Sequence, residues 1–129
     1  MKMFISFTKI LLFLPFLFCC SNESEGYQED DLKELNSLKK EIDQLVATGS
    51  CIENSNCDYL AFGSKPCGGP WSYIVFSKSV NIDLLKEKVA IYNLKESVYN
   101  KKWSIGSDCA FAMPPTALSC VDGKCVAVF

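Results

Sequence analysis

The residues with the widest chemical range in this sequence are eight cysteines, at positions 19, 20, 51, 57, 67, 109, 120 and 125. A cysteine can form a disulfide, bind a soft metal ion as a thiolate, or act as a nucleophile when its pKa is lowered. The 129-residue chain contains no histidine. This excludes Ser–His and Cys–His nucleophilic pairs within the chain, and also zinc sites that need histidine.

The spacing of the cysteines favours disulfides over a metal centre or a thiol catalyst. Five residues separate Cys51 from Cys57, and four separate Cys120 from Cys125, whereas about two to four separate the paired ligands of a typical zinc site. A redox catalyst would need a Cys-x-x-Cys motif, and the sequence has none. We therefore predict no metal site and no cofactor.

The first residues have the character of an export signal. Lys2 and Lys9 accompany an unbroken apolar run of nine residues over 10–18, ILLFLPFLF. The run is too short to cross a membrane as a helix, which takes about 20 residues, and a basic start before a short apolar run is typical of a signal peptide. The alternative is a buried core helix or an uncleaved anchor, but the run has no polar face of the kind a soluble amphipathic helix needs.

Residues 17–20, LFCC, resemble the lipobox of bacterial lipoproteins. In that family a leucine stands three positions before a lipid-modified cysteine, and small residues fill the positions between them. Leu17 and Cys20 fit this spacing, whereas Phe18 departs from it because the family has a small residue there. Cys19 is the alternative acceptor and fits the pattern less well.

The resemblance to lipoproteins implies a processed, anchored protein. Residues 1–19 would be the signal peptide, and Cys20 would carry the lipid. The following acidic segment, over residues 20–30, is poor in apolar side chains, so we predict a flexible tether there. The expected location is the cell membrane or outer membrane, with the domain facing the periplasm or the cell exterior.

Loss of Cys19 with the signal and lipidation of Cys20 leave six cysteines. An even number in a small exported domain predicts disulfides, because the compartment is oxidising. Six cysteines allow about 15 pairings, among which sequence alone does not choose. The candidates are Cys51, Cys57, Cys67, Cys109, Cys120 and Cys125.

The last two cysteines flank a hairpin signal. Asp122-Gly123 lies midway between Cys120 and Cys125, and Asp-Gly is favoured in two-residue hairpin turns. The two cysteines would then face each other across the strands, where they could bond directly or each reach a different distant segment. We favour distant partners, because long-range cross-links constrain the unfolded chain more.

The periodicity of apolar residues predicts a single small α+β domain over residues 31–129. Asp30 or Asp31 could cap the first of two helices, and Asn81 or Asp83 the second. β-Branched and aromatic runs predict strands in a short antiparallel sheet that includes the C-terminal hairpin. The expected helices cover about 31–48 and 82–102, and the expected strands cover 57–62, 71–76, 116–121 and 124–129.

Composition restricts the partners. All 13 basic residues are lysine, against 15 acidic residues. A mildly acidic chain without arginine is a poor ligand for nucleic acids, which are bound through cationic contacts to phosphate. The remaining candidates are the membrane, reached through the N-terminal lipid, and a protein or glycan.

One loop stands out as a candidate contact surface. Residues 63–70, GSKPCGGP, join two predicted strands, and their two adjacent glycines permit backbone angles that other residues avoid. The commoner interpretation of such a loop is a turn shaped around a disulfide. As a recognition loop, its candidate binding residues are Lys65, Gly68, Gly69 and Trp71.

We therefore expect a non-catalytic binding module, since rigid disulfide-rich scaffolds often bind through exposed loops. Its partner would be a glycan or a protein, such as a secreted hydrolase that it inhibits. The alternatives are a purely structural envelope lipoprotein and an enzyme that uses carboxylates. Residues 51–129 also resemble small cysteine-rich domains of uncharacterised bacterial exported proteins, a likeness that implies no activity.

Overall fold

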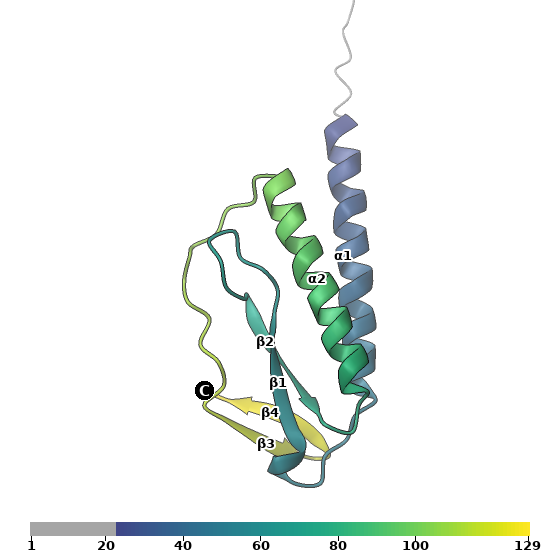
Figure 1. Ribbon diagram of the computed structural model, residues 1–129, viewed down its shortest axis with the longest axis vertical. Helices are drawn as coiled ribbons and strands as arrows, with labels where there is room; N and C mark the ends of the chain where they lie inside the picture. Colours follow the sequence, from purple (N-terminus) through teal and green to yellow (C-terminus); the bar gives the residue numbers. More distant parts are fainter. Residues whose placement is uncertain (1–22) are drawn as a thin grey trace, which may run out of the picture.

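The computed structural model describes residues 23–129 as an α+β domain (Figure 1). The predicted signal peptide and the predicted lipid site at Cys20 lie outside the described residues. No helix within the described part of the chain has the length and apolarity to span a membrane. In chain order the elements are α1 (Glu23–Ala47), the 3-10 helix η1 (Asn54–Asn56), β1 (Cys57–Phe62), β2 (Ser72–Ser77), α2 (Ile82–Lys102), β3 (Ala117–Val121) and β4 (Lys124–Val128).

Local sequence signals explain where α2 begins and ends. The side chain of Asn81 accepts a hydrogen bond from the backbone N–H of Leu84 at 3.1 Å, as an N-cap residue does. Asp83 lies in the first turn, and Lys101 and Lys102 lie in the last turn. These charges are placed favourably for the helix dipole, and the predicted helix over 82–102 is confirmed.

The predicted start of the first helix near residue 31 is wrong. α1 begins at Glu23, so residues 23–30, predicted to be part of a flexible tether, are helical. Neighbouring charges support this extension, because Lys33 Nζ lies 3.2 Å from a carboxylate oxygen of Glu29 within the helix. Contacts with α2 support it too, because Gln28 donates to the hydroxyl of Tyr99 at 3.2 Å.

The strands form two separate antiparallel ribbons, although a single sheet was expected. β1 pairs with β2 in a register that places Cys57 opposite Ser77. β3 pairs with β4 so that Cys120 lies opposite Cys125, as the Asp-Gly turn predicted. The segment between α2 and β3 contains no helix or strand.

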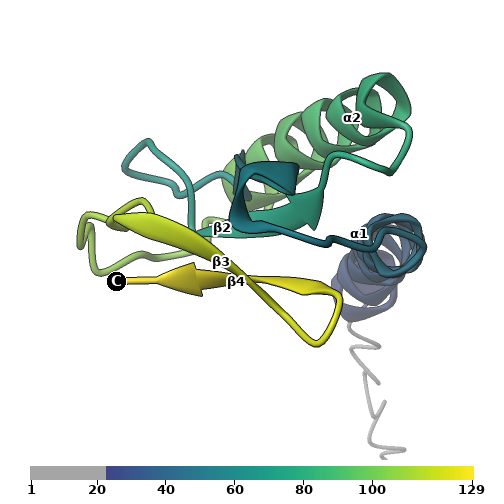
Figure 2. The same ribbon diagram turned by 90° about the horizontal axis from the view of Figure 1, so that it is seen from below.

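The β1–β2 ribbon lies in the middle of the domain. Figure 2 shows α2 on one side of it, the β3–β4 hairpin on the other, and α1 beside it. Because side chains alternate along a strand, Phe62 and Phe76 can face the helices while Cys57 faces the hairpin. The buried core lies between the helices and β1–β2, and it consists of Leu35, Ile42, Phe62, Phe76, Val80, Leu85, Val89 and Tyr92.

Truncating the centre of this core should destabilise the domain strongly. Ile42 is 0% exposed, and we expect Ile42→Ala to lower the free energy of unfolding by about 2–5 kcal/mol, because it leaves a cavity. The matched control is Leu94→Ala on α2, where the side chain is 68% exposed and the expected change is within about 0.5 kcal/mol. Urea denaturation of both variants provides the measurement, and equal losses would contradict this location of the core.

Candidate functional site

The six candidate cysteines form three disulfides, with Cα–Cα distances of 5.5 to 5.9 Å. Cys120 and Cys125 do not bond to each other. As favoured from the sequence, each bonds to a distant segment. Cys120 bonds to Cys51, which precedes β1, and Cys125 bonds to Cys57, the first residue of β1. The pairs are Cys51–Cys120, Cys57–Cys125 and Cys67–Cys109.

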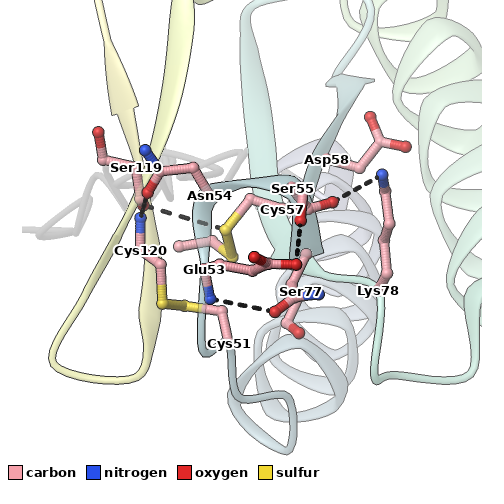
Figure 3. Close-up of a disulfide and its surroundings, with 12 residues drawn as sticks. Cys51, Glu53, Asn54, Ser55, Cys57, Asp58, Ser77, Lys78, Ser119 and Cys120 are labelled. Atoms are coloured by element: carbon pink, nitrogen blue, oxygen red, sulfur yellow. Dashed lines mark hydrogen bonds between the residues drawn. A yellow bond between two sulfur atoms is a disulfide. The ribbon is translucent and has the colours of Figure 1, made fainter.

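The first two bridges attach the hairpin to the rest of the domain. Figure 3 shows Cys51 bonded to Cys120, with Asn54 beside them. The side-chain oxygen of Asn54 accepts from the N–H of Cys120 at 2.8 Å, and the N–H of Cys51 donates to the carbonyl of Gly123 at 2.9 Å. Asp122 and Gly123 have φ angles of 51° and 76°. A type I′ turn requires positive φ at both of these positions.

The third bridge joins two loops that are remote in sequence. Cys67 lies in the loop over residues 63–71 and Cys109 lies in the irregular segment over residues 107–113. We call these two segments the loop pair. In Figures 1 and 2 the loop pair lies on the side of the molecule away from α1.

Gly68 and Gly69 form an exposed tip in this loop. Both have positive φ, 96° and 79°, and an added Cβ at either would meet no atom within 4 Å. The N–H of Lys65 donates to the carbonyl of Gly69, and the N–H of Gly68 donates to that of Lys65, both at 2.9 Å. The glycines therefore serve the turn geometry and leave its outer surface open.

Lys65 is buried, whereas a residue that contacts a partner would be expected on the surface. It is only 9% exposed, and its ammonium group donates to the backbone carbonyl of Ala110. The same group lies 3.4 Å from the carboxylate of Asp108 and 5.0 Å from the centre of the Trp71 ring. The buried ammonium group of Lys65 thus connects the two loops, through charge-assisted hydrogen bonds and a cation–π contact.

The same contacts lower the pKa of Asp108. The backbone N–H of Ala110 donates to its carboxylate at 3.0 Å. This hydrogen bond, followed by the one from Lys65, holds the pKa of the Asp108 carboxyl below its usual value. The carboxylate stays charged at neutral pH, and it completes the set of partners around the buried amine.

α2 fixes the start of the loop through polar side chains. The amide oxygen of Asn93 accepts from the N–H of Gly63 at 2.7 Å, and Glu96 accepts from the N–H of Ser64. A Cβ on Gly63 would lie 2.7 Å from Trp71 Cδ1, so this position has room only for glycine. Burial, and then the charge of Glu96, raise the pKa of Tyr92 to about 12, so the Tyr92 hydroxyl remains a neutral donor to Glu96 at physiological pH.

The loop pair exposes three large apolar side chains. Trp71 is 39% exposed, Phe111 76% and Met113 64%. Their segments are joined by the Cys67–Cys109 bridge, and the hydroxyl of Tyr73 on β2 lies 3.4 Å from the carbonyl of Ala112. Phe111 and Met113 were not singled out from the sequence. A signal was present, because both are bulky apolar residues in a segment without periodicity that Pro114 and Pro115 directly follow.

A hollow lies between the two helices. It has a volume of about 360 Å³, and apolar residues such as Leu94 and Val98 line it. Its carboxylates are already engaged, because Asp31 lies 2.7 Å from Lys102 Nζ and Glu34 lies 2.8 Å from Lys95 Nζ. The hollow therefore offers ion pairs, and not a carboxylate pair poised for acid–base chemistry.

The comparisons with known proteins give no family. No family model matches this chain, and no curated protein and no solved structure matches it significantly.

Removing the buried amine of Lys65 should loosen the loop pair. We expect Lys65→Ala to lower the free energy of unfolding by about 1–3 kcal/mol, because the carbonyl of Ala110 loses its donor. Lys86→Ala is the control, since Lys86 is exposed on α2 and its loss should change stability by less than about 0.5 kcal/mol. Urea unfolding with the disulfides intact measures both, and equal stability of the two variants would rule out the bridging role.

Proposed function

We propose that this chain is an envelope lipoprotein, anchored through a lipid on Cys20, whose domain is a non-catalytic binding module for a protein partner. The observation that carries the proposal is the exposure of Trp71, Phe111 and Met113 on two loops that a disulfide joins. Aromatic residues and methionine are enriched in protein interfaces, and buried tryptophan anchors often dominate their binding energy.

Rigidity of the loop pair supports recognition. The backbone of the pair is held by the Cys67–Cys109 bridge, by Lys65 beneath Trp71, and by Glu96 on α2. A surface that is already ordered loses less conformational entropy on binding, so more of the contact energy contributes to affinity. Lys65 acts as a support in this proposal and not as a contact.

The chemistry of the exposed side chains favours a protein over a glycan. Phe111 and Met113 offer apolar surface without hydrogen-bonding groups, whereas a glycan has hydroxyl groups that need polar partners. A protein that places an apolar surface on the loop pair would remove this area from water. One such partner is a secreted hydrolase, for which the rigid loops would act as an inhibitor.

A structural envelope role is the second candidate, and the length of α1 favours it. The helix has 25 residues and extends about 37 Å at 1.5 Å per residue. Its first residue follows Cys20 by three positions. With a lipid on Cys20, the first turn of α1, which precedes the contact between Gln28 and Tyr99, would act as a short spacer between the membrane and the domain.

The two candidates differ in their dependence on the loop pair. The test is recovery of partners from the envelope, by affinity capture of the full chain after cross-linking. Trp71→Ala/Phe111→Ala should reduce recovery of the main partner by about 30-fold, the effect of losing about 2 kcal/mol at an interface anchor. The control Leu94→Ala/Val98→Ala removes exposed apolar side chains from α2, and it should retain the partner.

Undiminished recovery by the Trp71→Ala/Phe111→Ala protein would exclude the loop pair as the contact. Loss of the partner from the α2 control alone would assign the contact to the helices. The lipid is tested separately, since a Cys20→Ala protein should leave the membrane fraction, and its retention there at normal level and size would contradict the anchor.

A further inference from the structure

α2 carries a second row of apolar side chains in addition to the row that faces the core. The core row is buried and includes Leu85, Val89 and Tyr92. The second row is exposed, at 37% to 68%, and consists of Leu84, Ile91, Leu94 and Val98. With 3.6 residues per turn, the two rows lie on nearly opposite faces of the helix. Figure 2 shows no other described element over the side of α2 that points away from β1–β2.

The spacing of the exposed row is that of a helix–helix seam. Leu84, Ile91 and Val98 are seven residues apart, and Leu94 follows Ile91 by three, so they occupy positions a and d of a heptad repeat. β-Branched residues at position a with leucine at position d favour two parallel helices. α2 has this combination over residues 91–98.

We propose that this row is the contact between two copies of this chain, whose α2 helices pair in parallel about a two-fold axis. Leu94 of one copy then lies against Leu94 of the other, and Ile91 and Val98 extend the contact on either side. A two-fold contact uses the same patch on both copies, so one self-complementary row is sufficient.

The lysines beside the row are neutralised by α1. They occupy position e of the heptads, and each ammonium group lies 2.7 or 2.8 Å from a carboxylate of α1. The pairs are Lys88–Glu41, Lys95–Glu34 and Lys102–Asp31. These ion pairs lower the repulsion that three lysines along one edge would cause when a second copy approaches.

The opposite edge of the row favours the parallel orientation. Position g is occupied by Asp83, Ala90 and Ser97, and in a parallel pair it faces position e of the other helix. Asp83 therefore approaches a lysine of the second copy, and the small Ala90 and Ser97 leave space for the other two. In an antiparallel pair position e faces position e, which would bring lysines toward lysines.

The seam is short, and the proposed anchor compensates for this. Glu87 and Lys101 occupy the d positions on either side of Leu94, so the apolar centre covers about 10 Å of helix. Contacts that bury less than about 1,200 Å² are typically weak. A lipid on Cys20 would raise the effective concentration of two copies in one membrane, and parallel helices place both anchors at the same end. This step rests on the proposed function, whereas the seam itself does not.

The experiment uses the full chain in vesicles of phosphatidylethanolamine and phosphatidylglycerol, with donor and acceptor dyes on separate copies. Energy transfer, followed as the protein-to-lipid ratio is varied, gives the dissociation constant. We expect saturable transfer for the wild type. Leu94→Glu and Leu94→Lys should each weaken self-association at least about 30-fold, because each places two like charges together in an apolar seam.

Mixing the two variants tests the orientation. Residue 94 faces its own counterpart only in the parallel pair, so an equimolar mixture of Leu94→Glu and Leu94→Lys copies should restore transfer between them. The matched control is Ile52→Glu, which adds a charge at an apolar residue that is 96% exposed and precedes η1, and should self-associate as the wild type does. The Trp71→Ala/Phe111→Ala protein should do so too.

Two results would overturn the pairing of α2 helices. The first is transfer in the wild type no greater than in Leu94→Glu, including the case in which Leu94→Glu instead loses a different envelope protein. The second is a mixture that stays unassociated although both variants unfold in urea at the wild-type midpoint. Sedimentation of Cys20→Ala copies in solution should give the same order of variants, so the seam, the anchor and the loop pair can fail separately.

Discussion

The attachment of the C-terminal hairpin by two disulfides is the constraint on which the rest of this structure depends. A two-stranded hairpin has little stability alone in water, and β3–β4 contributes no residue to the buried core. The bridges Cys51–Cys120 and Cys57–Cys125 span sequence separations of 69 and 68 residues. In the chain-entropy model each closure of this size stabilises the folded state by about 4 kcal/mol, and nested closures add less than their sum.

A disulfide also holds the candidate contact surface in place. The segment over residues 107–113 contains no helix or strand, so backbone hydrogen bonding alone would leave it loosely held. The Cys67–Cys109 bridge and the buried amine of Lys65 hold it against the loop over residues 63–71. The backbone that carries the exposed apolar side chains is thus held in place, which is a property that a recognition surface needs.

Elements with strong local signals could be predicted from the sequence, whereas those that depend on distant partners could not. Asp122-Gly123 fixes a hairpin because its turn needs positive φ at both positions, and Asn81 caps α2 through a bond to its own first turn. Residues 23–30 looked like a tether because their partners, such as Tyr99, lie far along the chain. The burial of Lys65 depends likewise on a carbonyl 45 residues away, and the pairing of the six cysteines depends on the whole fold.

The proposed lipid anchor and the three disulfides together require an exported, processed chain whose six remaining cysteines are all paired. The most direct test is mass spectrometry of the protein extracted from the envelope, first intact and then as unreduced peptides. We predict a chain that begins at Cys20 with added acyl groups, a mass lowered by two hydrogens per bridge, and linked peptides for the pairs 51–120, 57–125 and 67–109. An intact Met1 with free thiols, or a direct link between Cys120 and Cys125, would contradict it.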